Sequence, residues 1–363
     1  MSQGQTYAGW QPEKSGFIGG LSLTGFVFVL GAAIVVLIPL YRSSWSSLLI
    51  AAPLALLLVG LAYVRVGGLA ADEWLVLALR HSTNGALRRN AFLSGGFAPA
   101  RLDDVDQLQP IDLPGPLACL RVLEAPTGTG DTAAVVNDPL ANMYSAVMRL
   151  RPPGLALADT ARQDHRVNAW GAFLASLCIE DGSITRLAIT ERSFPDDGTT
   201  LRSWVEEHRV ADAPGASVRA LEELMSQAGP SSNQRDTFLT VTLSASKART
   251  KVKAAGGGRL GACAVLMREI SVMRSAVEAG ELQVVGTLSP RDLAEVIRTA
   301  FDPDSVHALT ARRAATNRGD NAMQAGVDPC VAGPAAAESS WGMYRHDGGW
   351  SVTYQVRDWP RAA

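Results

Sequence analysis

The residues best suited to chemistry lie in one stretch, where a basic cluster precedes a glycine-rich loop. Three of the four lysines in the chain fall within KARTKVK (247–253), together with one arginine. The four basic residues of this cluster are Lys247, Arg249, Lys251 and Lys253. Concentrated positive charge of this kind can hold a phosphate, an acidic lipid headgroup or a nucleic acid. We therefore treat the cluster as a candidate contact for an anion or a partner, beside the simpler interpretation of a solvated loop.

The glycine-rich sequence that follows, AAGGGRLGA (254–262), does not match a nucleotide-binding motif. A P-loop has a lysine and then serine or threonine after its last glycine, whereas Ala262 and Cys263 stand there in this chain. A dinucleotide fingerprint needs a strand directly before the glycines and an acidic residue about 20 residues further on. Only the glycines fit that pattern, so we expect a flexible helix start and no cofactor.

Cysteines, histidines and carboxylates form no catalytic or metal-binding pattern. The four cysteines are far apart, without a CxxC pair or paired histidine spacing. We therefore expect buried, reduced thiols and neither a zinc site nor a disulfide framework. The five histidines are scattered, and no Ser/His/Asp or Cys/His trio can be assigned from spacing. These observations predict a protein that is not an enzyme.

Composition limits the classes of partner. The 363-residue chain has a net charge of −2, which argues against a protein-wide attraction to nucleic acid. Direct nucleic acid binding is therefore not expected, and a DNA-contacting domain that uses the 247–253 cluster is a minor alternative. Hydrophobic residues make up 47% of the chain, and much of this excess lies in the first 70 residues. The hydrophobic fraction of the whole chain therefore averages over a membrane-like segment and a water-soluble one.

Two uncharged runs near the amino terminus predict a hairpin of transmembrane helices. The runs hold 27 residues between Lys14 and Arg42, and 22 between Arg42 and Arg65. A helix needs about 20 apolar residues to cross the hydrocarbon core. The apolar core of a signal peptide has only about 7–15 residues, and buried helices of soluble proteins rarely stay uncharged for so long. Neither run contains the ionisable residues that transporters need, so the hairpin is expected to be an anchor.

Flanking charges predict the orientation of the hairpin and the domain boundaries. Lys14 precedes the first run, Arg65 and Arg80 follow the second, and only Arg42 lies in the turn. Positive charge favours the cytoplasmic side, so we expect a multi-pass protein of the cell membrane with both termini in the cytoplasm. Small residues in the runs would also permit a homo-oligomer. The expected parts are a cytoplasmic tail (1–15), a transmembrane hairpin (16–65), a connector (66–103) and a cytoplasmic α+β domain (104–363), with possible halves at 104–212 and 213–363.

The soluble region is predicted to be a mixed α/β domain. Alternating apolar and β-branched residues predict three strands, at 117–125, 132–138 and 142–151. The glycines Gly128 and Gly130 predict the turn between the first two strands. Apolar residues then recur at helical spacing from Val167 to Cys178, which predicts a helix. A strand that ends at FPDDG (194–198) completes this first strand–helix–strand round.

A second round follows in the same order. Its elements are a strand at 236–245, a helix at 258–280 and a strand at 281–289. We interpret the two rounds as duplicated strand–helix–strand units. Ser289 is then predicted to cap a helix that begins at Pro290. Residues 312–340 are predicted to form a long loop, and two strands joined at Gly348-Gly349 are predicted to close the chain.

Four segments resemble a known family. They are DLPGPLACLRVLE, DHRVNAWGAFLASLCIEDGSITRLAITERSFPDD, VVGTLSPRDLAEVIRTAFDP and SVTYQVRDWPR. They resemble an actinobacterial family of two-helix membrane proteins linked to conjugative, type IV-like transfer systems. The resemblance implies a hairpin similar to the small PrgI-like inner-membrane subunits. It also implies a soluble part similar to the non-catalytic amino-terminal domain of conjugation ATPases.

The last segment contains a motif of those ATPases. Trp359, Pro360 and Arg361 match residues that precede the nucleotide-binding domain in that family. Only two residues follow Arg361 here, whereas family members usually continue, so the chain is expected to be either a shortened member or part of a longer one. No Walker lysine is present, and the resemblance therefore implies no motor activity.

The resemblance implies a non-enzymatic, membrane-anchored scaffold subunit of a conjugative or type IV-like transfer apparatus. Such a subunit would contact the lipid bilayer and dock a conjugation-type ATPase or other transfer subunits at the cytoplasmic face. Two alternatives stay open at the level of sequence. One is a type VII-like secretion subunit, and the other is a membrane-anchored enzyme with an unrecognised site.

Overall fold

The protein, described here by a computed structural model, divides into two compact units. The first comprises residues 1–91, 339–344 and 351–363, and the second comprises 92–338 and 345–350. The structure describes residues 23–42, 45–66, 69–95, 111–128, 130–154, 158–178, 182–195, 199–210, 212–228, 233–317, 319, 324–354 and 356. Helices and strands are mixed along the chain after two apolar helices, which confirms the predicted α+β class.

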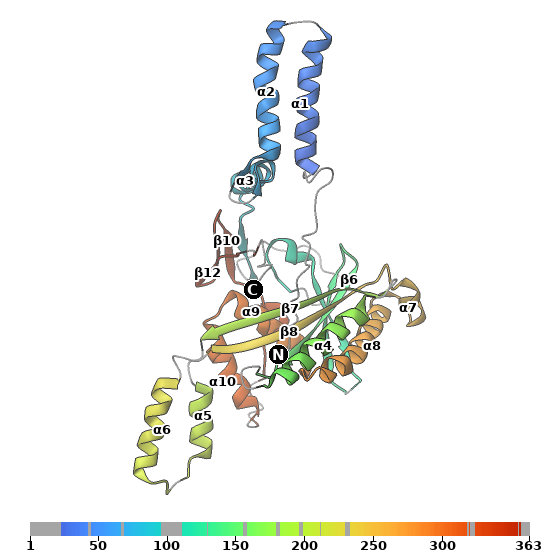
Figure 1. Ribbon diagram of the computed structural model, residues 1–363. Helices are drawn as coiled ribbons and strands as arrows, with labels where there is room; N and C mark the ends of the chain where they lie inside the picture. Colours follow the sequence, from blue (N-terminus) through green and yellow to red (C-terminus); the bar gives the residue numbers. More distant parts are fainter. Residues whose placement is uncertain are drawn as a thin grey trace. The chain divides into compact units, whose positions relative to one another are not determined.

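The first unit begins with two long apolar helices that lie side by side (Figure 1). They are α1 (Leu23–Tyr41) and α2 (Trp45–Tyr63). Both are long and apolar enough to cross a membrane. The predicted pair of apolar helices is therefore present.

Small residues fill the contact between α1 and α2. The buried positions of the two helices are Gly25, Ala32, Pro39, Ala51, Ala55 and Ala62. The large apolar side chains lie on the outside instead, and Ile50 and Leu56 are 74% and 77% exposed. Small residues let helix backbones approach closely, as is common in membrane helix pairs. This arrangement is the reverse of that in a helix at the core of a water-soluble domain.

A third helix follows the hairpin inside the segment predicted as a connector. A two-stranded ribbon of β1 (Arg65–Val66) and β2 (Leu69–Ala70) leads into α3 (Ala71–Ala86). Figure 1 shows α3 at the end of α2 that leads into it, and α3 contacts both α1 and α2. Asp72, in the first turn of α3, is fully buried and accepts a hydrogen bond from the hydroxyl of Thr24 in α1. This bond ties the start of α3 to the hairpin.

The second unit is built on a six-stranded sheet of order β4-β5-β6-β8-β7, in which β9 also pairs with β6. The strands are β4 (Arg121–Pro126), β5 (Thr132–Asp138), β6 (Met143–Arg151), β7 (Ile184–Pro195), β8 (Asn233–Ser244) and β9 (Gln283–Thr287). The helices are α4 (Thr160–Leu177), α5 (Thr199–His208), α6 (Gly215–Ala228), α7 (Arg249–Ala254), α8 (Gly258–Ala279), α9 (Pro290–Phe301) and α10 (Ser305–Asn317). All the pairs of neighbouring strands are antiparallel.

Two strand–helix–strand segments interleave in this sheet. Strands β6 and β7, which α4 connects, lie on either side of β8. Strands β8 and β9, which α8 connects, lie on either side of β6. Each connected pair is therefore separated by one strand of the other pair, as in the split β-α-β arrangement of ferredoxin-like folds.

Helices cover both faces of the sheet. α8 packs on one face against alternate residues of β6 and β8, among them Met148, Leu239 and Val241. The other face packs against α9 and α10, where Leu293 and Leu309 join a second buried cluster. α8 occupies the helix predicted at 258–280, and its apolar residues at helical spacing are buried, among them Cys263, Leu266, Ile270, Met273 and Val277, whereas Met267 is half-buried.

Local sequence patterns predicted the start of a helix correctly in two places. Ser289 and Asp292 form the predicted capping box at the start of α9, with Pro290 at the first position. α8 begins at Gly258, directly after glycines in the left-handed conformation. By contrast, η2, a 3-10 helix at Gly115–Cys119, occupies the first residues of the strand predicted at 117–125.

Two parts of the second unit differ from the sequence interpretation. The helical pair α5 and α6, which the sequence patterns did not predict, is inserted between β7 and β8 (Figure 1). The loop predicted at 312–340 is shorter, because α10 continues to Asn317 and strand β10 occupies Ala336–Ser339. A small sheet has the order β12-β11-β10-β3, with β3 at Ala91–Leu93, β11 at Tyr344–His346 and β12 at Gly349–Ser351.

We predict that Gly261→Ala lowers stability whereas Gly171→Ala does not. A Cβ atom at Gly261 in α8 would lie 2.5 Å from the carbonyl oxygen of Val252 in α7, so α7 must move. Overpacking of this kind costs about 1–3 kcal/mol. Gly171 lies in α4 with open space around it, and alanine is favoured over glycine in a helix by about 1 kcal/mol. Urea unfolding of the detergent-solubilised variants, followed by circular dichroism, checks this, and equal midpoints would contradict it.

Candidate functional site

The candidate site is an open slot in the sheet between β5 and β9. β5 pairs with β6 only along Val135–Asp138, and β9 takes the place beside β6 along Met148–Arg151. The two strands meet where the Ala134 N–H donates a hydrogen bond to the carbonyl oxygen of Leu288. Before this junction, Thr132 and Ala133 of β5 pair only with β4, and β9 pairs only with β6, among the described strands. We call the space between these two unpaired strand edges the strand notch.

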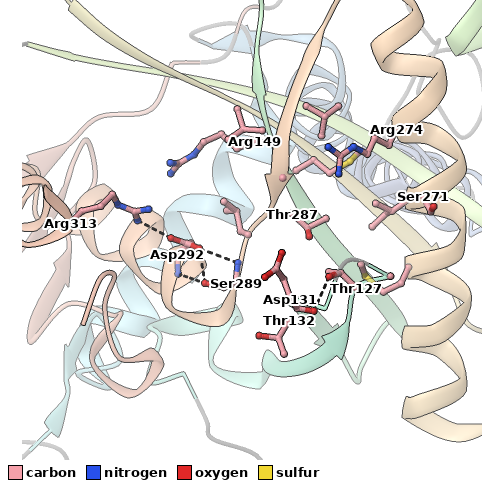
Figure 2. Close-up of a pocket in the computed structure, with 18 residues that line it drawn as sticks. Thr127, Asp131, Thr132, Arg149, Ser271, Arg274, Thr287, Ser289, Asp292 and Arg313 are labelled. Atoms are coloured by element: carbon pink, nitrogen blue, oxygen red, sulfur yellow. Dashed lines mark hydrogen bonds and ion pairs between the residues drawn. The ribbon is translucent and has the colours of Figure 1, made fainter. Parts of the chain in front are cut away.

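The strand notch is a cavity of about 890 Å³ (Figure 2). Six consecutive residues, Val284–Ser289, line one wall, and Thr127, Asp131 and Thr132 of the β4–β5 hairpin line another. Sheet edges of this kind present unpaired N–H and C=O groups. The notch therefore offers backbone hydrogen-bonding groups to an extended chain.

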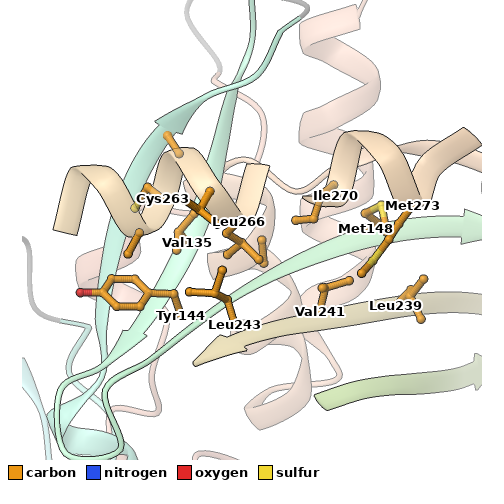
Figure 3. Close-up of a cluster of buried hydrophobic side chains, with 14 of the residues drawn as sticks. Val135, Tyr144, Met148, Leu239, Val241, Leu243, Cys263, Leu266, Ile270 and Met273 are labelled. Atoms are coloured by element: carbon orange, nitrogen blue, oxygen red, sulfur yellow. The ribbon is translucent and has the colours of Figure 1, made fainter. Parts of the chain in front are cut away.

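Helices from both layers line the strand notch. Met148 of β6 and Ile270 of α8, which belong to the buried core that Figure 3 shows, also line the cavity. Asp292 of α9 and Arg313 of α10 contribute from the opposite layer. An extended segment in the notch would thus have helices on both of its faces. The floor of the strand notch would be apolar and its rim polar, as in many ligand sites.

Three arginines contribute positive charge to the lining, and two of them are engaged in ion pairs. Arg313 donates to Asp292 at 2.8 Å and to Glu295 at 2.7 Å, and Arg274 donates to Glu278 at 2.9 Å. Arg149 differs, because its guanidinium lies over a phenylalanine ring and its Nε is buried without a hydrogen-bond partner among the described residues. Arg149 is therefore the lining arginine with donor capacity left for a bound group.

Asp292 links the start of α9 to α10 at the edge of the notch. It accepts hydrogen bonds from the backbone and hydroxyl of Ser289 and from Arg313. Burial raises the pKa of this carboxyl, but those hydrogen bonds and the charge of Arg313 outweigh burial, so the pKa lies below its ordinary value. The ionised carboxylate therefore stabilises this wall of the notch.

The lining residues are suited to binding. Of the described residues that line the notch, none is a histidine or a cysteine. Within the described parts of the chain there is also no group of three or more His, Cys, Asp or Glu side chains that could hold a metal ion. What the notch does provide is two strand edges, an apolar floor and charged groups on the rim, which is the chemistry of peptide recognition by strand addition.

The basic cluster predicted from sequence lies elsewhere in the second unit. Lys247, Arg249, Lys251 and Lys253 are all exposed, on α7 and just before it, and none lines the strand notch. Lys251 is partly neutralised, because it donates to Glu269 at 3.0 Å and to Ser183 at 3.2 Å. The cluster is therefore carried by a short helix, and not by the loop that the sequence suggested.

The carboxyl-terminal motif and the four cysteines were also singled out by the sequence. The motif Trp359, Pro360 and Arg361 lies outside the described residues. The cysteines are free thiols as expected, but the expectation that they are buried is correct only for Cys263. Burial raises the pKa of Cys263 to about 11. Cys178, at the carboxyl-terminal cap of α4, and Cys330, in the 3-10 helix Pro329–Val331, are exposed.

Sequence reasoning missed the strand notch, because the notch depends on which strands share an edge of β6. One local signal was present. Gly286 lies inside β9, and a glycine inside a strand often marks a bulge. The pairing of β6 with β9 does shift register between Arg149 and Leu150.

Comparisons with known proteins identify no relative. No family model matches the chain, and neither a curated protein nor a solved structure matches it. The apolar hairpin, the interleaved sheet and the strand notch are thus the features from which a function follows.

We predict that Asp292→Asn destabilises the protein in a pH-dependent way. Because the pKa is lowered in the folded state, the carboxylate stabilises the fold above its ordinary pKa of 3.8, and this stabilisation is lost as pH falls through the folded value. We expect a loss of about 1–3 kcal/mol at pH 7 and a smaller one at pH 3. Urea unfolding at both pH values measures this. Asp304→Asn, at an exposed position, is the control, and an equal deficit at both pH values would contradict the assignment.

Proposed function

We propose that the protein is a non-enzymatic, membrane-anchored scaffold subunit of a conjugative or type IV-like transfer apparatus. In this role α1 and α2 span the cell membrane with both termini in the cytoplasm, and the second unit docks an ATPase or another subunit. The observation that carries the proposal is the combination of an outwardly apolar helical hairpin with a soluble unit whose sheet is open at the strand notch.

The packing of the hairpin supports the anchor. Its large apolar side chains point outward along both helices, while alanines and glycine form the contact between them. In water, such exposure would cost about 25 cal/mol for each Å² of apolar surface. In a bilayer the same surface contacts lipid tails and carries no such penalty. The uncharged length of each helix, which matches the hydrocarbon core, supports the same conclusion.

The family resemblance and the topology support the scaffold role. Two interleaved strand–helix–strand segments are the expected product of a duplicated unit, and we infer that β6–α4–β7 and β8–α8–β9 are its two copies. The resemblance to the amino-terminal domain of conjugation ATPases concerns this part of the chain and carries no nucleotide-binding lysine. A domain of this kind can position partners without performing chemistry itself.

We infer that the strand notch is the docking surface and that its occupant is an extended segment of a partner subunit. The two outer strands of the sheet, β4 and β7, both carry charged residues, among them Glu124 on β4 and Arg192 on β7. Charges on an edge strand oppose further pairing. The edge of β9 is uncharged from Val284 to Thr287 and lies inside a cavity. An alternating apolar segment would add to this edge, and a carboxylate on it would pair with Arg149.

Labelling of native cysteines tests the anchor. Cys178 and Cys330 are exposed thiols in the second unit, so a membrane-impermeant maleimide should react with them only after the cells are permeabilised. Arg42→Cys, in the turn between α1 and α2, should react in intact cells. Labelling of the native cysteines in intact cells, or a purified chain that lacks α1, would contradict the proposed topology.

Co-purification tests the docking surface. Val285 of β9 and Ile189 of β7 are both edge-strand residues, and they are 50% and 54% exposed. Val285→Trp should fill the notch and abolish recovery of a near-stoichiometric transfer ATPase or other transfer subunit from the native membrane in mild detergent. Ile189→Trp should leave recovery unchanged. The proposal fails if the wild-type protein is isolated alone, or if both variants retain the same partners.

A further inference from the structure

Helix α3 exposes apolar side chains immediately after the hairpin. Its first half contains the run WLVLAL (74–79), in which Trp74, Val76, Leu77 and Leu79 are each between 41% and 57% exposed. The second half is polar, from Arg80 to Asn84. A short helix that exposes this much apolar surface needs a cover that is apolar on one side and accepts polar groups on the other.

The position of α3 in the first unit indicates what covers it. α3 lies at the end of α2 (Figure 1), and the Thr24–Asp72 hydrogen bond joins α3 to α1. The exposed apolar surface of α3 therefore continues the exposed apolar surface of the hairpin. If the hairpin spans a bilayer, a helix held at its end lies at the boundary between acyl chains and headgroups.

Charge on and after α3 indicates the kind of headgroup. Arg80, Arg88 and Arg89 are exposed, while Glu73 is the one exposed acidic residue within 71–90, a stretch that the structure describes completely. Juxtamembrane arginines attract the anionic lipids of the cytoplasmic leaflet. The predicted orientation places this end of the hairpin on that side.

Arg88 has a backbone conformation that glycine usually adopts. It follows the end of α3 with a φ of 53°, in the left-handed region. Helices commonly end with glycine in this conformation, because other residues meet a steric penalty there. A non-glycine residue strained in this way is often found at functional sites, and here the strained residue carries a positive charge.

We propose that α3 lies in the membrane surface and that Arg80, Arg88 and Arg89 form a binding site for anionic lipid headgroups. This inference rests on the proposed membrane anchoring of α1 and α2. The apolar run enters the acyl boundary, and the arginines hold the phosphate groups of phosphatidylglycerol or a similar lipid. The site fixes the level at which the chain leaves the bilayer.

Fluorescence in lipid nanodiscs tests the insertion of α3. The full chain, with Cys119, Cys178 and Cys330 replaced by serine, carries an environment-sensitive probe at Leu79→Cys or at Leu140→Cys. Leu140 is a matched control, because it is 84% exposed in the second unit. The probe at position 79 should show blue-shifted emission and quenching by shallow spin-labelled lipids, and the probe at position 140 should show neither. Water-like emission at position 79 would overturn the inference.

Native mass spectrometry tests the lipid site with phosphatidylglycerol and phosphatidylcholine as probes. The detergent-solubilised protein should retain phosphatidylglycerol preferentially, and Arg88→Gly should weaken retention about five-fold, as expected for one juxtamembrane cation. The same variant relieves the backbone strain, so its unfolding midpoint should stay equal or rise. Retention that is unchanged in Arg88→Gly and in the double variant Arg80→Gln, Arg89→Gln would refute the site.

Carbonate extraction of the same membranes separates the two proposals. If alkaline carbonate releases the wild-type protein, the proposal that α1 and α2 span the membrane is wrong. The proposed lipid site, which depends on that anchoring, is then rejected as well. If the protein stays in the membrane while position 79 reports water, anchoring holds and only the inference about α3 fails.

Discussion

The second unit depends on how strand β6 shares its two edges. One edge pairs with β8 over eight residues, and the other is divided between β5 and β9. β5 and β9 are both antiparallel to β6, so they run in the same direction and meet at the bond between Ala134 and Leu288. Because both strands cannot occupy the same length of β6, they must diverge beyond that bond. The strand notch follows from this constraint.

Packing around β6 keeps the notch in place. Met148 joins the core beneath α8, while the far side of the sheet rests on α9, whose start is fixed by the capping box of Ser289 and Asp292. The ion pairs of Arg313 then hold α10 against α9. The walls of the notch are therefore rigid elements, which lowers the entropic cost of binding an extended segment.

The features that the sequence predicted correctly are those determined by local patterns. The uncharged length of α1 and α2, the apolar face of α8 and the cap at Ser289 each depend on residues a few positions apart. The notch could not be predicted in this way, because it depends on the pairing of residues 134 and 288. The basic residues of α7 were predicted to contact an anion from their composition alone, and in the folded chain Lys251 pairs with Glu269. The α5–α6 pair was missed because two separate helices lie on either side of Pro214, so no single helical repeat runs through the segment.

Site-specific photo-crosslinking tests the central claim most directly. A photoreactive amino acid is placed at Val285 in the notch, or at Ile189 on the opposite edge of the sheet, in the full-length protein in its own cells. If the strand notch is the docking surface, position 285 crosslinks to one discrete segment of a transfer-apparatus subunit and position 189 does not. Equal crosslinking from both positions, or none from position 285 in cells with an active apparatus, would contradict it.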